Sequence, residues 1–584
     1  MKGPPEIIPK VETWQAALES AASSNSGLTF VDLREQETFV PWSLLAQCAR
    51  RFASSLVGMG IRPGDRVALV LPTGPEFIQS FFGSLLAGAV PVPLYPPIRL
   101  GKLDEYYAST ARMLQVTSAR VVITDFRVRA LFGRPLAKAR PDLGCKLADE
   151  LTRESAEVAL PGSADDLALI QFSSGTTVDP KPVALTHRNL LFQCAALHQL
   201  IRESCSPPHV GVSWLPLYHD MGLIGSLLSA VYYPGHLVLI APENFLARPC
   251  LWLRAISRHR ATASSAPNFA YGLCVRRIRD EELKDVNLAS WRLAGNGAES
   301  ISMKVMKKFT ARFQAWGFAE RAFAPGYGLA EASLALTSVP PSSGATALRI
   351  DPSELAKCGR AVSGEFEIVS VGPPSAGVEL EVRDEHGKGL PDRRVGRIFA
   401  RGPSVMSGYF GAPGVSSRSL ANGWLDTGDL GFTVDGELFI SGRVKEVIVI
   451  RGANHQPREF ESVLEEVEGV RTGCAVALGF IPPGGEGEEL LILAERTPLA
   501  GGDLAEQIRA AVLEKTRIRP YQVEVLAPGT LPRTSSGKLR RAEALRQFSA
   551  GRLAAPKRLT PLRIAAELAR SAIGFAKFGF ADEG

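Results

Sequence analysis

The chain has 584 residues, a length at which a single hydrophobic core normally gives way to two or more domains. Hydrophobic residues make up 45% and charged residues 22%, as in ordinary globular proteins. The net charge of +6 is small, and no basic tract with interleaved aromatic residues occurs, which argues against a nucleic-acid-binding protein.

The cysteines and histidines show no metal-binding spacing. Eight cysteines are scattered without a CxxC pair, and the eight histidines form no HxxxH cluster, so we expect no dedicated zinc site. Buried free thiols in a reducing cytoplasm explain the cysteines better. The N-terminus lacks the apolar segment of a secretory signal, and we therefore expect a cytoplasmic protein.

The first half of the chain alternates between helical and strand patterns. Apolar residues have helical spacing at 42–60 and 76–89, and each of these segments is followed by a buried strand pattern, at 66–72 and 90–94. Further strand patterns follow at 119–125, 167–174, 210–216 and 237–242. Strands separated by helices of this length predict right-handed βαβ units on a parallel sheet.

The longest uncharged run, residues 221–241, has the length of a membrane span, but Pro234-Gly235 interrupts it. A buried helix followed by a strand is the better interpretation, and we expect no membrane span.

From about Val369 the pattern changes. Short strands with glycine and Asp-Gly turns at 378–384, 396–402 and 423–442 predict a small antiparallel or barrel-like unit. The mixed strand and helix patterns at 447–515 then predict a separate α+β domain, with the boundary at Gly442-Arg443.

The last segment, residues 551–584, holds six Lys/Arg and three Asp/Glu. Thr560 is a plausible N-cap and Pro561 a plausible first helical residue, and Ile564, Leu568, Ala572 and Phe575 share one face. One interpretation is a basic amphipathic helix that meets an acidic partner or a membrane surface. The other, favoured here, is a helix packed on its own domain.

Five segments carry residues suited to chemistry on a nucleotide. The first, "SSGTTVDPKPVALTH" at 173–187, is a Ser/Thr/Gly loop between a predicted strand and a predicted helix, which can offer amides and hydroxyls to phosphates. It is not a Walker A loop, because GxxxxGK[ST] is absent from the chain. A plain surface turn is the competing interpretation.

The other four segments are each ambiguous alone. Tyr327 can stack on a base, and Glu331 is either a Mg²⁺ ligand or a helix-starting residue. Asp429 can accept ribose hydroxyls or simply form an Asp turn. Arg443 lies at the predicted domain boundary, and Lys538 lies in a Gly/Ser loop where a lysine is normally just solvated.

Together and in this order, the five segments resemble the adenylate-forming superfamily of acyl-CoA synthetases, peptide-synthetase adenylation domains and luciferases, over about residues 25–545. Segments similar to the fatty acyl-AMP ligase branch lie at 87–97, 212–225, 264–274, 291–300 and 450–461. Acyl-CoA ligases more often carry a GYNVYP-like sequence where "GANHQP" stands here. The stretch at about 340–370 corresponds to the insertion of fatty acyl-AMP ligases, which hinders the rotation needed for CoA use.

The resemblance implies an α/β fold with a large N-terminal domain (1–442) of parallel sheets plus a small β-barrel-like unit, a small mobile α+β domain (443–550) and a basic tail (551–584). It implies a fatty acid and ATP as substrates, acyl-AMP and pyrophosphate as products, and acyl transfer to the phosphopantetheine thiol of an acyl carrier protein.

The resemblance also assigns roles to residues. Lys538 would bridge the carboxylate and the α-phosphate, Glu331 would hold Mg²⁺, and His219 would act as a gate beside the acyl site unless it is satisfied locally. Lys445 belongs to the hinge segment. Nucleotide binding falls to Ser174, Gly175, Thr176, Thr177, Lys181, Asn296, Gly297, Ala298, Tyr327, Gly328, Asp429 and Arg443. The acyl tunnel falls to Met221, Gly222, Gly225, Asn268 and Phe269. Each buried methylene contributes about 0.8 kcal/mol, so tunnel length selects chain length.

The loop departs from the superfamily pattern "TSGSTGDPKGV" at two positions. Val178 disfavours positive φ and Pro182 lacks an N–H donor. Loss of one hydrogen bond to a charged group costs about 1.5–3 kcal/mol, which weakens nucleotide binding without abolishing it. Two alternatives stay open: a long-chain acyl-CoA ligase, and a catalytically quiet nucleotide- or fatty-acid-binding protein.

Overall fold

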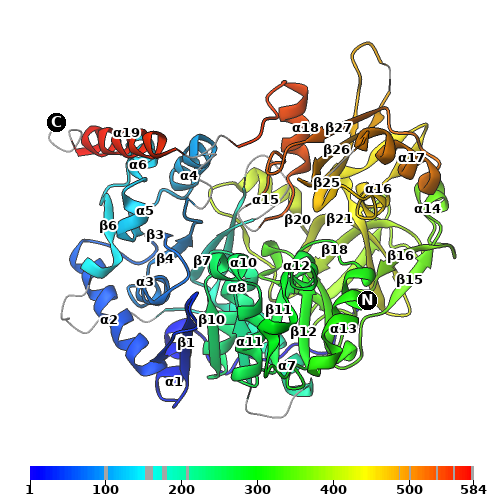
Figure 1. Cartoon of the computed structure of the whole chain (residues 1–584). Helices are drawn as coiled ribbons and strands as arrows, with labels where there is room; N and C mark the ends of the chain where they lie inside the picture. The colour runs from blue at the N-terminus through cyan, green and yellow to red at the C-terminus, as the bar shows by residue number, and fades with distance from the viewer. Residues whose placement is uncertain are drawn as a thin grey trace.

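The computed structural model describes residues 1–97, 103–151, 162–173, 180–204, 209–485, 487–498, 502–534, 537–556 and 560–579. Its largest sheet has eight strands (Figure 1). Their spatial order is β14 (Ala335–Ser338), β13 (Phe323–Gly328), β12 (Leu293–Gly297), β11 (Ala263–Pro267), β9 (Val210–Ser213), β10 (His236–Ile240), β1 (Gly27–Val31) and β2 (Glu37–Pro41). The six inner strands are parallel and the two edge strands antiparallel, which agrees with the predicted βαβ pattern.

A second parallel sheet lies in the N-terminal part of the chain. Its order is β4 (Val90–Pro93), β3 (Arg66–Val70), β5 (Val121–Thr124) and β6 (Cys145–Leu147). Helices α2 (Trp42–Gly58) and α3 (Pro75–Leu86) pack closely, because Gly83 brings its backbone against Phe52, where a β-carbon would lie 2.6 Å from that ring. The other long helices of the large domain are α1 (Trp14–Ala22), α4 (Leu103–Thr117), α7 (His187–Ser204), α11 (Cys250–Arg258), α12 (Asn268–Arg277) and α13 (Met303–Phe313).

The sequence predicted that the loop at 173–187 leads from a strand directly into a helix, and this prediction is wrong. It joins two antiparallel strands, β7 (Leu167–Phe172) and β8 (Pro182–Thr186), and α7 begins only at His187. The apolar run Val183-Ala184-Leu185 pairs with β7, and β19 (Gly408–Tyr409) completes a three-stranded sheet. Pro182 is the first residue of β8, a position at which the missing N–H of proline removes no hydrogen bond between strands. The helix N-terminus therefore lies one strand away from the loop.

The β-rich unit is a five-stranded antiparallel sheet of β17 (Glu379–Arg383), β18 (Gly396–Arg401), β21 (Trp424–Val434), β20 (Leu420–Ala421) and β22 (Glu437–Arg443). The segment at 340–370 folds against it as a hairpin, β15 (Ala347–Ile350) and β16 (Phe366–Val369), with the short helix α14 (Pro352–Cys358) between the strands. Ile350 and Ile368 share a small core with Phe432 and Phe439, so this segment is an integral part of the unit.

The C-terminal domain has cores of its own. Its elements are β23 (Ile448–Ile450), β24 (Ala453–His455), α16 (Pro457–Leu464), β25 (Val470–Phe480), β26 (Glu489–Arg496), α17 (Leu504–Thr516), β27 (Gln522–Leu526) and α18 (Arg541–Ser549). The buried residues on the two faces of β25 and β26 form two clusters drawn from residues 448–544. The smaller domain stands above the large one in Figure 1.

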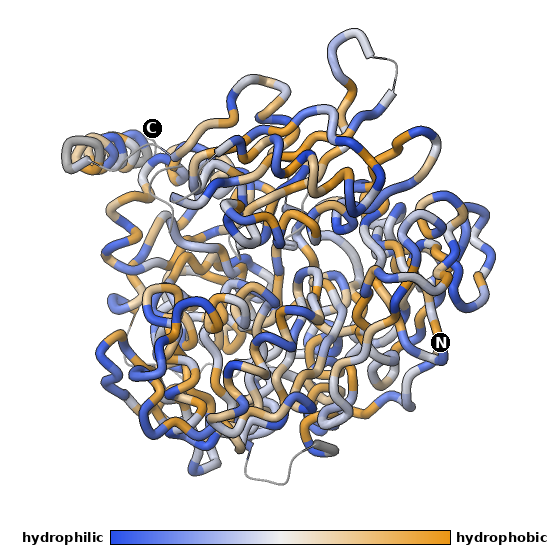
Figure 2. The backbone as a smooth tube through the Cα atoms, turned by 45° about the vertical axis from the view of Figure 1, so that its right-hand side comes forward, coloured by the Kyte–Doolittle hydropathy of each residue, from blue (hydrophilic) through white to orange (hydrophobic). Residues whose placement is uncertain are grey.

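The last helix, α19 (Pro561–Gly579), returns to the large domain and lies on α6 (Gly133–Ala139), at the edge of the molecule in Figures 1 and 2. The backbones touch: a β-carbon on Gly133 would lie 1.9 Å from the carbonyl oxygen of Ser571, and the Gly133 N–H donates to Ser571 Oγ at 2.9 Å. The helix is thus packed within the chain, as favoured from the sequence, but on the large domain rather than the adjoining small one. Contact with an acidic partner or a membrane surface stays a prediction.

The uncharged run at 221–241 folds as α8 (Asp220–Gly222), the π-helical turn η3 (Leu223–Leu228), α9 (Ser229–Tyr232) and strand β10. Among the described residues, no helix is long and apolar enough to cross a membrane. The helix-then-strand interpretation of this run is confirmed.

Candidate active site

A cavity of about 2050 Å³ lies between the large sheet and the small domain. The strands β11, β12 and β13 are parallel neighbours, and all three end at its wall. Asn268, Ala298 and Leu329 are the first residues beyond these strand ends. Ligands of open parallel sheets bind at such carboxyl ends, and most of the candidate residues from the sequence meet here.

The turn after β12 brings backbone rather than side chains to the cavity. Ala298 has φ 67°, a left-handed conformation that costs free energy in a non-glycine residue and marks functional sites. A β-carbon on Gly297 would lie 3.0 Å from the Gly326 carbonyl oxygen, and one on Gly328 would lie 1.7 Å from the Leu334 carbonyl oxygen. These glycines let β12 and β13 present a flat backbone surface suited to a planar ring.

Asn296 and Asn268 connect this surface to the acyl side of the cavity. Both are buried, and the Asn296 Nδ2 donates to Asn268 Oδ1 at 3.4 Å. Asn268 Oδ1 also accepts from the Ser302 N–H at 3.1 Å, which fixes the start of α12.

Tyr327, Asp429 and Arg443 form one chain of contacts. The Tyr327 hydroxyl donates to Asp429 Oδ2 at 2.6 Å, and Arg443 Nε lies 2.8 Å from Asp429 Oδ1. Asp429 and Arg443 are directly paired residues of β21 and β22. Burial raises the pKa of Asp429, while the guanidinium of Arg443 opposes that rise and favours the carboxylate. The arrangement suits a ligand with vicinal hydroxyls.

Glu331, Tyr409 and Lys181 form a second chain on the phosphate side. The Tyr409 hydroxyl lies 2.9 Å from Glu331 Oε1 and 3.3 Å from Lys181 Nζ, and the Lys181 ammonium sits 4.6 Å from the centre of the Tyr409 ring. Burial raises the pKa of Glu331 and lowers the pKa of Lys181, and each group opposes the shift of the other. Polyanionic phosphates and a divalent cation would satisfy both.

The phosphate loop itself is only partly described. Ser174, Gly175, Thr176 and Thr177 lie outside the described residues, as does Val178. At the loop ends, the Ser173 N–H donates to the Lys181 carbonyl at 2.9 Å and the Lys181 N–H approaches Ser173 Oγ at 3.3 Å. These bonds hold Lys181 at the mouth of the loop.

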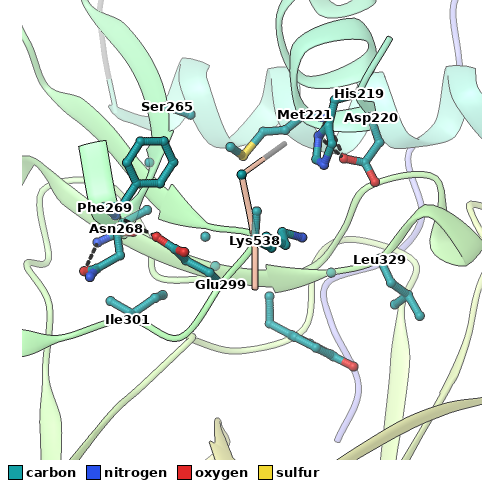
Figure 3. A pocket seen from close by; sticks show the side chains of 18 of the residues that line it. His219, Asp220, Met221, Ser265, Asn268, Phe269, Glu299, Ile301, Leu329 and Lys538 are labelled. Carbon is teal, nitrogen blue, oxygen red and sulfur yellow. Dashed lines mark hydrogen bonds and ion pairs between the residues drawn. The ribbon is translucent and has the colours of Figure 1, made fainter. Parts of the chain in front are cut away.

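His219 and Phe269 face the cavity on its acyl side (Figure 3). His219 is buried, and its Nδ1 lies 2.8 Å from Asp220 Oδ1, to which it donates when protonated there, and 3.3 Å from the Met221 backbone nitrogen. One nitrogen is therefore satisfied locally, whereas Nε2 has no partner among the described residues. His219 can therefore make local contacts through Nδ1 and still present Nε2 at the cavity wall. Its role as a gate stays a prediction.

Two glycines shape the wall near Met221. A β-carbon on Gly222 would lie 2.3 Å from the Pro216 carbonyl oxygen, and one on Gly225 would lie 3.0 Å from Leu334. The helical turn can approach the preceding segment and the edge of the sheet only because both positions lack side chains. Met221, Gly225, Asn268 and Phe269 all line the cavity, whereas Gly222 does not and is buried against the backbone of Leu215 and Pro216.

Lys538 enters this cavity from the small domain (Figure 3). Its backbone is held in a tight turn: the Lys538 N–H donates to Thr534 Oγ1 at 3.0 Å, and the Thr534 N–H donates to the Lys538 carbonyl at 2.8 Å. Burial lowers the pKa of Lys538, while the carboxylates of Asp220, Glu299 and Asp429 oppose that shift. A cation from one domain thus faces carboxylates and the ribose-side residues of the other.

Sequence reasoning missed three functional candidates: Asp220, Glu299 and Tyr409. Glu299 accepts from the Phe269 N–H at 2.6 Å, and burial raises its pKa. Asp220 follows His219 and Glu299 follows Ala298 in the sequence. Their position next to residues already assigned to the site could have identified them as candidates. The sequence around Tyr409 contains no comparable indication, because only the pairing of β19 with β8 brings this residue to Lys181.

Lys445 lies in η8 (Val444–Glu446), immediately after β22, and lines the cavity at the domain junction. Its hinge role, like the domain boundary beside it, stays a prediction. No group of three or more His, Cys, Asp or Glu residues with metal-binding geometry occurs in the described part of the chain. Glu331 offers a carboxylate at the phosphate side, which fits Mg²⁺, since this ion usually combines one or two carboxylates with substrate phosphates and water.

Residues 18–410 match the family model described as AMP-binding enzyme. The chain belongs to the AMP-binding enzyme family. This match covers the two parallel sheets, the β7–β8 hairpin and Glu331.

Relatives and solved structures narrow the branch of this AMP-binding enzyme. It is 37% identical to a putative acyl-CoA synthetase of Caulobacter vibrioides, over 92% of this chain and 96% of that protein. It is 32% identical to the medium-chain-fatty-acid–[acyl-carrier-protein] ligase JamA of Moorena producens, over 91% and 93%. A structure described in work on fatty acyl-adenylate ligases from E. coli and L. pneumophila superposes with a TM-score of 0.87 at 33% identity, over 94% and 99%. The chain is an adenylate-forming ligase of the fatty acyl-AMP ligase branch.

Proposed function

We propose that this enzyme joins a fatty acid to AMP with release of pyrophosphate, and then passes the acyl group to the phosphopantetheine thiol of an acyl carrier protein. The observation that carries the first step is the position of Lys538. It reaches from the small domain into the cavity where Asp429 and Glu331 of the large domain and Arg443 at the end of β22 also meet. Support for the second step comes from relatives such as JamA, whose name specifies a carrier-protein ligase.

ATP would occupy the cavity with its base on the surface formed by Gly297, Ala298 and Tyr327. Asp429 and Arg443 would bind the ribose hydroxyls, since a carboxylate accepts two hydrogen bonds in this geometry. Lys181 would hold the outer phosphates together with the hydroxyls of the preceding loop. Glu331 would hold Mg²⁺, which supplies neutralisation of phosphate charge when bound.

The chemistry asks for alignment and charge neutralisation rather than a nucleophilic side chain. A carboxylate oxygen of the fatty acid attacks the α-phosphorus, the new O–P bond forms, and the bond to pyrophosphate breaks. Both partners are anions, so a cation placed between them lowers the barrier as they approach. Lys538 would supply that cation, and the nearby carboxylates of Asp220 and Glu299 favour its charged form.

The segment at 340–370 supports the carrier protein over free CoA as acceptor. Helix α14 lies against β24 of the small domain, and the guanidinium of Arg458 lies 6.0 Å from the centre of the ring of Phe366 in β16. Arg458 also donates to the carbonyl of Ile301, and Lys304 pairs with Glu466 at 2.6 Å across the same interface. A small domain held at these points rotates less readily than one joined only by its hinge segment.

The test combines three assays on the full chain. Pyrophosphate exchange driven by fatty acids of different lengths reports adenylation, and a hydroxylamine trap detects the acyl-AMP. Separate acceptor assays with CoA and with a phosphopantetheinylated carrier protein report transfer. Brisk formation of acyl-CoA would overturn the carrier-protein proposal in favour of an acyl-CoA ligase. No exchange with any fatty acid, in well-folded protein, would favour a binding protein without catalysis.

A further inference from the structure

The cavity continues beyond Met221 along one face of the helical segment that contains η3 and α9. The residues on this face that line it are Gly225, Ser226, Ser229, Ala230 and Tyr233. Apart from Tyr233 at the far end, these are small side chains at helical spacing, which explains why the space is open. With a rise of 1.5 Å per residue, the segment from Met221 to Tyr233 is about 18 Å long. An extended acyl chain whose carboxylate meets Lys538 would run along it.

The far end of this path is polar. The cavity is lined here by Tyr233, by His198 from α7 and by His209, which immediately precedes β9. The rings of His198 and Tyr233 stack with centroids 3.8 Å apart, and the ring of His209 lies 6.4 Å from that of Tyr233. The Nε2 of His198 and both ring nitrogens of His209 are buried without a hydrogen-bond partner among the described residues. Unpartnered buried polar atoms are rare and costly, and three of them converge here.

Both imidazoles are neutral at physiological pH. Burial lowers the pKa of His198 to about 4 and also lowers the pKa of His209. A neutral imidazole offers one donor and one acceptor, which matches a hydroxyl group that itself donates and accepts. Arg292, Arg202 and Lys10, the cations that act on these two rings, are exposed and do not line the cavity, so a carboxylate at this end would find no buried counter-charge.

We propose that His198 and His209 form a subsite for a hydroxyl group at the distal end of the acyl chain, so that the enzyme selects long hydroxylated fatty acids. This inference rests on the proposed function and names its substrate class. An unsubstituted chain leaves the ring nitrogens unpaired, whereas a terminal hydroxyl satisfies them. A hydroxylated chain too short to reach them places its hydroxyl between Gly225 and Ala230, where it loses hydration without gaining these partners.

The test measures kcat/KM for pyrophosphate exchange with pairs of fatty acids, unsubstituted and ω-hydroxylated, from about eight to about eighteen carbons in length. We expect the unsubstituted acid to be preferred at short lengths and the hydroxy acid to be preferred by about fivefold to tenfold at the length that reaches the histidines. His198→Phe and His209→Phe should remove that preference, and His198→Gln, which keeps a donor and an acceptor, should retain part of it.

His236→Phe is the matched control. His236 also lines the cavity, but its Nε2 lies 3.0 Å from Thr29 Oγ1 and is already paired, so this variant should leave the ratio of hydroxy to unsubstituted acid unchanged. The subsite would be overturned if kcat/KM for the hydroxy acid never exceeded that for the unsubstituted acid at any chain length. It would also be overturned if the preference for the hydroxy acid remained in both Phe variants. A preference for α,ω-dicarboxylic acids over hydroxy acids would overturn it too. Exchange with neither kind of acid would instead count against the proposed function.

Discussion

Replacing Lys538 with alanine tests whether the small domain supplies the cation for adenylation. The variant should fold normally, because the carboxylates around Lys538 keep other partners. Asp220 retains His219 at 2.8 Å and the Met221 N–H at 2.7 Å, and Glu299 retains the Phe269 N–H at 2.6 Å. No buried carboxylate is left without a partner, so the free energy of unfolding should change little.

The effect on the reaction should be large. Removing one preorganised donor to developing charge costs about 2.7–4 kcal/mol in an enclosed site, or about 10²–10³-fold in rate. Lys538 acts as two anions approach, so kcat and kcat/KM for ATP should fall together while KM changes little. The assay is fatty-acid-dependent pyrophosphate exchange at saturating ATP, with thermal unfolding measured in parallel.

Lys515→Ala is the control for this variant, because Lys515 is an exposed lysine of the same domain, in the last turn of α17. It should leave exchange unchanged. Exchange by Lys538→Ala within about threefold of the wild type would refute the assignment, since that corresponds to well under 1 kcal/mol of transition-state stabilisation.

Three further outcomes are expected. Burial lowers the pKa of Lys538, and only the charged lysine can stabilise the reacting anions. The adenylation rate should therefore fall at alkaline pH, and this fall should begin at a lower pH in the wild type than in Lys538→Arg, whose side chain stays charged. A pH–rate profile of both proteins measures this. Phe366→Ala removes the ring beneath Arg458 but keeps the buried Ile350 and Ile368, which deletion of residues 340–370 would remove. Both changes should raise turnover with CoA, and an unchanged preference for the carrier protein would contradict this role of the segment. Gly574→Leu should displace α19 from α6, because a β-carbon at position 574 would lie 2.5 Å from the Gly133 backbone. The backbone amides of α19 should then exchange with solvent faster, whereas Ala576→Leu, on the exposed face of the same helix, should leave their exchange rates unchanged.

Much of the fold follows from patterns within short segments. The β-branched runs that became β3, β5 and β10 are short, buried and bounded by turn residues, and such runs predict parallel strands directly. The strand β8 was missed because Pro182 and the polar residues before it look like loop, and only pairing with β7 makes the segment a strand. The docking of α19 on α6 joins residues 438 positions apart, and no local pattern encodes such a contact.

The candidate site was predictable where one residue type must stand at one backbone position. Gly297, Gly328 and Gly222 each occupy a position where a β-carbon would overlap a carbonyl oxygen or crowd it. The partners of the charged residues were less accessible to sequence reasoning. Tyr409 reaches Glu331 through a three-stranded sheet assembled from distant segments. The histidines at the far end of the cavity come from α7 and from the position just before β9, which share no motif.

The charges around the cavity explain why two domains share one site. The cations Lys538 and Arg443 lie close enough that the guanidinium helps to lower the pKa of Lys538, and Arg443 likewise contributes to the lowered pKa of Lys181. In the free protein the carboxylates of Asp220, Glu299 and Asp429 offset the repulsion between Lys538 and Arg443, which is consistent with the position of Lys538 in the cavity. A polyanionic nucleotide would add attraction for each cation, because each would then face phosphate oxygens. Since a ligand stabilises whichever state binds it more tightly, we expect nucleotide binding to favour the arrangement in which Lys538 lies in the cavity.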